Sequence, residues 1–472
     1  MRHQPNALTL SHQVRSSVQL GVLALIVFVI ILFLDNQFRV LPQSIHEHLP
    51  AHHEGLVITD ITVKTCSAVN PFSSCKLNQE EWHRVEKDLY LDSGWVSQAY
   101  VHVKRKKEEE LTTSDKIVIN IKCGRLDPAM GEKNKGNEKW ESRPAGIWIL
   151  RSDKRHESDS KEAVTAVDVV FGPDAADPRL GWKIRDTPLL LDAGQDGHEV
   201  HLTIRSGRLQ KVDRPTPRIR KDGKFKILQL ADLHLSTGLG HCRDAEPKDH
   251  NGGQCDADPR TLAFVHRILD DEEPDLVVLS GDQVNGDTSP DPQTPIFKFA
   301  ELLVKRRNPI PYAAIFGNHD DESTLSRSAQ MSLMEGMPYS LSEAGPSTVD
   351  GVGNYVVEVL ASGTSHHSAL SLYFLDTHSY SPDEQRYRGY DWIKESQIQW
   401  FKETSQANKK KHKQYTKIHL DMAFIHIPLP EYRDEENLRV GDWLEPPTAP
   451  AFNTHFKDAL VEEDVRVVSC GQ

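Results

Sequence analysis

The sequence lacks an excess of positive charge. Its 472 residues contain 56 Lys and Arg against 69 Asp and Glu, so the formal net charge is -13. A general nucleic-acid binder needs a basic surface to neutralise phosphates. We therefore expect no nucleic acid among the partners. The length predicts two or three domains, and a hydrophobic content of 38% is ordinary for globular ones.

Cysteine is scarce, with six residues, and no Asn-x-Ser/Thr acceptor for N-glycosylation occurs. Cys66 and Cys75 bracket a short polar loop, and Cys242 and Cys255 bracket another. Each pair could close a local disulfide in an oxidising lumen, or all four residues could be reduced thiols. The sequence leaves both alternatives open.

Long apolar runs are absent, with one exception. Residues 20–34 (LGVLALIVFVIILFL) carry no charge and no proline. The run is slightly short of an average bilayer core, but Val18 and Gln19 could extend it, and we expect an uncleaved transmembrane signal anchor over residues 18–34. A cleaved secretory signal and a buried helix are the alternatives, but no A-x-A-like cleavage site follows the run.

The flanks of this run extend the membrane hypothesis. Arg2 and Arg15 precede it and favour a cytoplasmic N-terminus. Residues 1–17 would then be a polar tail, and residues 35–55 a stalk. We expect a single-pass protein of the endomembrane system whose remaining chain is luminal or extracytoplasmic.

Residues 56–205 have the signals of β-structure. Short stretches alternate between apolar and polar residues, and Gly, Pro and Asp clusters separate them. We expect a β-rich accessory domain without catalytic motifs, followed by a linker over residues 206–223. The expected strands are 57–63, 116–122, 146–150, 167–171 and 200–204.

From residue 224 to 472 the pattern changes to alternating strands and helices, which predicts an α/β domain. Open α/β sheets bind ligands at the carboxyl ends of their strands. Asp258 and Pro259 predict the N-cap and first position of a helix. The expected helices are 258–270, 295–307, 396–408 and 452–462. The expected strands are 225–230, 275–280, 312–316, 355–360, 370–375, 422–427 and 465–469.

Polar side chains follow four of these strands. Asp232 and His234 end the first, Asp282 the second, Asn318 the third and His426 a later one. Carboxylate, imidazole and amide oxygen together suit Mn, Fe or Zn. We expect two metal ions with Asp282 between them. The two ions would hold a phosphoryl oxygen and activate a hydroxide.

Two further residues point to acid/base chemistry. His319 follows Asn318 directly, and Asp320 follows His319. His319 could protonate the leaving oxygen while Asp320 orients its ring. We therefore predict His319 and Asp320 as catalytic residues.

These blocks, D-x-H, G-D and G-N-H-D, resemble the calcineurin-like metallophosphoesterase superfamily, which includes purple acid phosphatases. Residues 228–234, 257–261, 280–284 and 374–378 are most similar to fungal cell-cycle-regulator phosphatases and the plant purple-acid-phosphatase-29-like branch. The resemblance covers about residues 223–472. It implies a layered β-sandwich core flanked by helices.

The resemblance also implies roles for the site residues. Asp232 and His234 would bind one metal ion, Asn318 and His426 the second, and Asp282 would bridge them. A metal-bound tyrosinate is not expected, because Asn285 stands where purple phosphatases have Tyr. The phosphate-binding Arg of the calcineurin-type G-D-x-V-D-R-G block is also missing, since Gly286 directly follows Asn285.

The superfamily's G-H-x-H block presents a third departure. Gly471 matches its glycine, but Gln472 follows and both histidines are missing. Each metal ion would lose one protein ligand, and we expect weak metal binding. The chain would be a truncated form or an impaired enzyme.

The sequence therefore predicts a metal-dependent phosphatase that hydrolyses phosphate monoesters, with phosphoproteins as a plausible substrate class. A phosphodiesterase or pyrophosphatase acting on nucleotides or lipids is one alternative, because the two-metal core serves all of these reactions. A non-catalytic binding module, a pseudophosphatase, is the other.

Overall fold

The computed structural model describes residues 18–31 and most of 55–472. The expected tail over residues 1–17 and nearly all of the expected stalk over 35–55 lie outside the described residues. Within 55–472 the segments left out are 68–73, 92–95, 113, 132–137, 154–160, 193–196, 213, 244, 414, 416–417 and 442–447.

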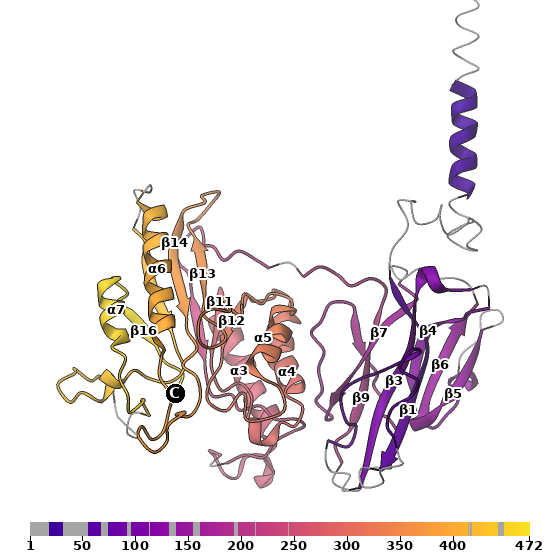
Figure 1. Ribbon diagram of the computed structural model, residues 1–472, viewed down its shortest axis with the longest axis horizontal. Helices are drawn as coiled ribbons and strands as arrows, with labels where there is room; N and C mark the ends of the chain where they lie inside the picture. The colour runs from indigo at the N-terminus through magenta and orange to yellow at the C-terminus, as the bar shows by residue number, and fades with distance from the viewer. Residues whose placement is uncertain are drawn as a thin grey trace, which may run out of the picture. The chain divides into compact units, whose positions relative to one another are not determined.

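Residues 18–31 form a helix with exposed side chains (Figure 1). Residues 32–34, the end of the predicted membrane segment, lie outside the described residues. No helix in the described part of the chain is long and apolar enough to cross a membrane. The predicted membrane segment over 18–34 therefore has no support in this structure.

The chain forms two compact units. The first comprises the described residues up to 168 together with 185–193 and 204–209. The second comprises 169–184, 194–203 and 210–472. Segments 169–184 and 194–203 thus belong to the second unit, although they lie within the range expected for the accessory domain.

The first unit is built from antiparallel strands, as the alternating sequence predicts. In one sheet, strand β3 (Ser97–Lys107) lies between β1 (Leu56–Ser67) and β2 (Trp82–Arg84). In another, β6 (Ile147–Ser152) lies between β4 (Ile117–Cys123) and β5 (Lys139–Arg143). A further sheet, whose residues are divided between the two units, has the order β7-β9-β8, with β7 at Val164–Phe171, β8 at Trp182–Ile184 and β9 at Val200–Ser206.

Both cysteine pairs are disulfide-bonded. Cys66 joins Cys75, with Cα atoms 5.1 Å apart, and Cys242 joins Cys255, with Cα atoms 5.6 Å apart. The alternative of four reduced thiols is therefore not the arrangement found in the structure.

The second unit contains two sheets. In the parallel one, β11 (Leu276–Ser280) lies between β10 (Ile227–Leu230) and β12 (Tyr312–Ile315). The other has the order β13-β14-β15-β16. Its strands are β13 at Tyr355–Leu360, β14 at Ser368–Phe374, β15 at Leu420–Phe424 and β16 at Val467–Ser469.

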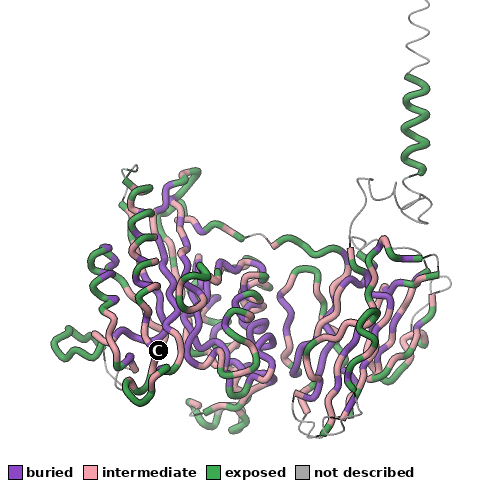
Figure 2. Tube along the Cα trace, viewed as in Figure 1, coloured by how far each residue is buried: buried purple, intermediate pink, exposed green. Residues whose placement is uncertain are grey.

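These two sheets form a layered sandwich with helices on both outer faces (Figure 1). Strand β11 is buried along its whole length, and its alternate residues pack into two different hydrophobic cores. Leu276 and Val278 pack between the sheets, and Val277 and Leu279 pack towards the helices. Figure 2 shows this burial along both sheets. The covering helices are α3 (Ala257–Glu272), α4 (Gln293–Val304) and α5 (Arg327–Glu335) on one face, and α6 (Glu395–His412) and α7 (Phe456–Glu462) on the other.

Two helical details differ from the sequence prediction. Helix α5 was not expected, and helix α3 has Asp256 rather than Asp258 at its N-cap. Asp258 lies inside the helix and is 1% exposed. Its Oδ2 accepts a hydrogen bond from the amide of Ser236 at 2.9 Å, so the carboxylate joins the helix to the loop after β10.

A buried ion-pair triad holds part of this unit together. The Nζ of Lys298, on α4, lies 2.6 Å from Asp174 Oδ2 and 2.8 Å from Asp258 Oδ2. The same ammonium donates to the carbonyl oxygens of Ser236 and Gly238. Burial raises the pKa of Asp258 to about 6, although the charge of Lys298 opposes the shift. The ammonium therefore compensates two carboxylates that water reaches poorly.

Replacing this ammonium by an apolar side chain, Lys298→Met, is expected to cost about 3–5 kcal/mol of stability at neutral pH, because it leaves uncompensated buried charge. At about pH 5 the loss should be smaller. There Asp258 can take up a proton, which favours the folded state because its pKa is raised in that state. Urea denaturation at about pH 5 and about pH 7.5 measures both losses.

Lys305→Met is the matched control, because Lys305 is exposed at the C-cap of the same helix. It should change stability by less than about 0.5 kcal/mol at either pH. Equal losses for Lys298→Met at the two pH values would contradict the role assigned to the ammonium.

Candidate metal centre

The predicted ligands follow strands that end on one edge of the two sheets. Asp232 follows β10, Asp282 follows β11 and Asn318 follows β12, and these three strands are parallel neighbours. His426 follows β15 of the second sheet. The carboxyl ends of parallel strands meet at one edge, so side chains far apart in sequence come together there.

The backbone at these positions is unusual. Asp232, His234 and Asp282 have φ angles of 56°, 46° and 54°. Few residues other than glycine adopt this left-handed conformation, and such strain is typical of functional sites. Hydrogen bonds between the two loops hold it: the amide of Asp232 donates to the Gly281 carbonyl at 3.0 Å, and that of His234 donates to the Asp282 carbonyl at 2.9 Å.

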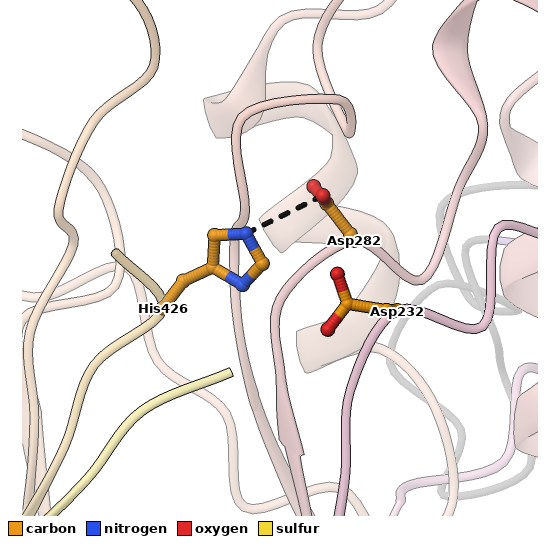
Figure 3. A group of neighbouring side chains, drawn as sticks. All are labelled: Asp232, Asp282 and His426. Carbon is orange, nitrogen blue, oxygen red and sulfur yellow. Dashed lines mark ion pairs between the residues drawn. The ribbon is translucent and has the colours of Figure 1, made fainter. Parts of the chain in front are cut away.

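The five predicted ligands form one cluster. His426 Nε2 lies 3.3 Å from Asp282 Oδ2 and 3.2 Å from Asn318 Oδ1. His234 Nε2 lies 3.8 Å from Asp282 Oδ2 and 3.8 Å from Asp232 Oδ1. Asp282 contacts both histidines, as a bridging ligand would. Figure 3 shows Asp232, Asp282 and His426 pointing towards one another.

This donor set fits a metal ion. Asp232, Asp282 and His426 each offer one ligand atom, and these atoms lie within 4.8 Å of one another. Asp282, Asn318 and His426 are buried, whereas the side chain of Asp232 is 37% exposed. One side of the cluster is therefore open to solvent, and carboxylate and imidazole donors suit divalent transition metals.

The electrostatics of the cluster favour positive charge. The Asp232 carboxylate, 3.8 Å from Nε2, raises the pKa of His234. Burial alone would lower the pKa of His426, but its hydrogen bond and ion pair with Asp282 outweigh burial and raise it. Burial likewise opposes the shift at Asp282, whose pKa is lowered by His426. The carboxylates thus attract cations, either protons or metal ions.

The structure corrects the predicted pairing of Asp320 with His319. Asp320 is 1% exposed, and its oxygens accept hydrogen bonds from the backbone amides of Asp282, Val284 and Gly317 at 2.8, 2.9 and 2.6 Å. The His319 ring bonds instead through Nδ1 to Glu322 Oε2, at 2.8 Å. Backbone amides without another partner are strong donors, and here they bond to the Asp320 carboxylate in place of the His319 ring.

Sequence reasoning singled out neither Glu322 nor Tyr380 as a site residue. The hydroxyl of Tyr380 donates to Glu322 Oε1 at 3.0 Å, and Asn318 Nδ2 donates to that hydroxyl at 3.4 Å. A carboxylate three residues after His319 is within reach in a turn, which is a signal the sequence did contain. Tyr380 lies 62 residues from Asn318, so nothing local points to it.

Glycines allow the close approach of the surrounding chain. A Cβ atom on Gly281 or on Gly471 would collide with the His426 ring, and one on Gly317 would collide with the Asp282 carboxylate. The amides of Gly471 and Gln472 donate to the His426 carbonyl at 3.1 and 3.0 Å. Gly471, which matches the glycine of the G-H-x-H block in sequence, thus lies beside His426.

Comparison with known proteins agrees with this geometry. Residues 225–471 match the model of the calcineurin-like phosphoesterases. The chain belongs to this family. Family membership confirms the resemblance seen in the sequence and the metallophosphoesterase fold, and it implies divalent metal ions at the cluster.

Three relatives illustrate the range of the family. The chain is 38% identical over 324 residues to phosphatase DCR2 of Saccharomyces cerevisiae, covering 65% of this chain and 54% of that protein. It is 32% identical over 408 residues to uncharacterized protein C1020.05 of Schizosaccharomyces pombe, covering 82% and 70%. It is 35% identical over 270 residues to probable inactive purple acid phosphatase 29 of Arabidopsis thaliana, covering 54% and 68%. The chain spans about half the length of the yeast phosphatase.

Metal affinity should rise as pH rises from about 5.5 to about 8. His234 and His426 have raised pKa values in the metal-free protein, and both must lose their protons before they can bind a metal ion. Calorimetric titration with Mn or Zn ions measures the affinity. Titrations in buffers of different ionisation enthalpy measure the protons released.

Asp282→Asn serves as the comparison, because it removes the bridging carboxylate while keeping the side-chain volume. It should weaken binding more than about 100-fold. Affinity that is independent of pH in the unsubstituted protein would contradict the role of the two histidines.

Proposed function

We propose that this protein is a metal-dependent phosphatase that hydrolyses phosphate monoesters, with phosphoproteins as its substrate class. One observation carries the proposal: Asp282 lies between His234 and His426, with Asp232 and Asn318 beside them. Two ions of Mn, Fe or Zn at this cluster would supply Lewis acidity and a hydroxide near neutral pH.

The chain's own residues divide the remaining work. Asp232 and His234 would hold one ion, Asn318 and His426 the other, and Asp282 both. The ring of His319 lies at the edge of the cluster, 5.2 Å from the ring of His234, centroid to centroid. It is suitably placed to protonate the leaving oxygen of a substrate that enters from the solvent side.

We also retain the endomembrane location as a proposal. The two local disulfides support it, because such bonds persist in oxidising compartments. A second candidate function, a non-catalytic binding module, is favoured by the name of one relative, probable inactive purple acid phosphatase 29.

Hydrolysis of p-nitrophenyl phosphate by the purified chain, with Mn, Fe or Zn ions added, tests the proposal. We expect turnover that exceeds turnover of bis(p-nitrophenyl) phosphate, because the proposed substrates are monoesters. Asp282→Asn should lower kcat/KM at least about 100-fold, whereas Asp270→Asn, on the exposed face of α3, should leave it unchanged.

The outcomes separate the candidates. Faster turnover of the diester would favour the phosphodiesterase. Tight metal binding without turnover of either ester would favour the binding module. A variant in which a His-x-His sequence follows Gly471 should bind metal ions more tightly if the histidines of the G-H-x-H block bind the ions.

A further inference from the structure

The ring of His319 is held by a residue outside the expected motif. Its Nδ1 lies 2.8 Å from Oε2 of Glu322, and the two side chains are 32% and 20% exposed. Asp320, the neighbouring acid, is occupied by three backbone amides and is not available to the ring. Glu322 is thus the only carboxylate that bonds to this ring among the contacts of the described residues.

Glu322 is itself fixed on two sides. Its second oxygen, Oε1, accepts the hydroxyl proton of Tyr380 at 3.0 Å. Its Cα and Cβ pack against Gly286, where any Cβ would collide with them, and the Gly286 amide donates to the His319 carbonyl at 3.1 Å. The carboxylate therefore has one defined position rather than the freedom of a surface glutamate.

This contact determines the tautomer of the ring. An ionised carboxylate only accepts hydrogen bonds, so Nδ1 must carry the proton between His319 and Glu322. Nε2 is then the nitrogen left to serve the reaction, and the ring stands edge-on to that of His234, at an interplanar angle of 62°. The second nitrogen of a histidine is commonly set by the bond that the first one makes.

We propose that Glu322 is the positioning residue of His319. It keeps Nδ1 protonated and the ring turned so that Nε2 gives its proton to the leaving oxygen of a phosphate monoester, an assignment that rests on the proposed function. In that step the P–O bond to the leaving group breaks and a P–O bond to a water-derived hydroxide forms. His319 enters the step with protons on both ring nitrogens, the Nε2 proton moves to the leaving oxygen, and the ring becomes neutral with Nδ1–H on Glu322.

The tautomer can be read in the metal-free protein without any activity. Nitrogen-15 NMR of histidine-labelled chain, with His319 assigned by its loss in His319→Asn, should show a proton on Nδ1. In Glu322→Ala this preference should disappear. In Glu322→Gln it should persist, because the amide oxygen still accepts from Nδ1, and this variant keeps the test valid if the alanine variant folds poorly.

Asp270→Asn is the matched control. Asp270 Oδ2 lies 3.1 Å from Nδ1 of His266 on the exposed face of helix α3, so the substitution should alter the signals of His266 and leave those of His319 unchanged. A neutral His319 ring that carries its proton on Nε2 rather than on Nδ1 in the unsubstituted chain, or the same tautomer in Glu322→Ala, would overturn the proposal.

Kinetics supply the second readout. Nitrophenolate departs without a proton, whereas phenolate needs one, so Glu322→Ala should lower kcat for phenyl phosphate about 100-fold or more and for p-nitrophenyl phosphate less than about 10-fold. KM should change little for either substrate. Equal losses for the two substrates would indicate a merely structural role and reject the proposal. If the unsubstituted chain hydrolyses neither ester with any metal, the proposed function fails, and the NMR result alone decides the position of His319.

Discussion

The carboxylate of Asp320 ties together the two loops on which the site is built. It accepts hydrogen bonds from the amides of Asp282 and Val284 after β11, and from that of Gly317 after β12. Burial, and then the charge of Asp282, raise its pKa to about 6. The three amides offset part of the cost of burying this group. They also fix Asp282 at the left-handed conformation that turns its side chain into the cluster.

A second buried charge supports the same loops from the side. Arg327, on α5, donates to the carbonyl of Gly317 at 2.6 Å and to that of His378 at 3.0 Å. It also pairs with Asp376, which is fully buried and whose pKa it lowers against the effect of burial. Helix α5 thus serves the site although it supplies no ligand, because its first residue clamps the backbone beside Asn318.

The sequence was sufficient for the framework of the site and insufficient for its supports. Buried runs such as residues 276–279 of β11 are apolar because both faces of the strand pack against other elements, and this pattern predicts parallel strands whose ends converge. That reasoning brought Asp232, Asp282, Asn318 and His426 together correctly. The roles of individual polar groups were not predictable, because several hydrogen-bond donors compete for each buried carboxylate and the sequence does not show which donors lie nearby.

Asp320 illustrates this competition. Adjacent His and Asp residues suggest a bonded pair, but successive side chains point apart, and unpaired amides nearby were better partners for the carboxylate. Asp258 differs for the same reason: its carboxylate bonds to Lys298 and Ser236, which are 40 and 22 residues away, rather than capping its own helix. Sequence spacing indicates only which neighbouring residues a carboxylate could bond to. In the folded protein a buried carboxylate bonds to the donors that surround it, and these can be distant in sequence.

The charges of the cluster also explain why this site should bind a cation. Asp232, Asp282 and Asp320 converge where Asp282 and Asp320 have almost no contact with water. Without a metal ion, the charge can be balanced only by protons, which is why the pKa values of His234 and His426 are raised. A divalent ion would replace those protons and bring the carboxylates a stronger counter-charge. Metal binding would then stabilise the loops after β10 and β11 as well as supply chemistry, because the unfolded chain has no such site to offer.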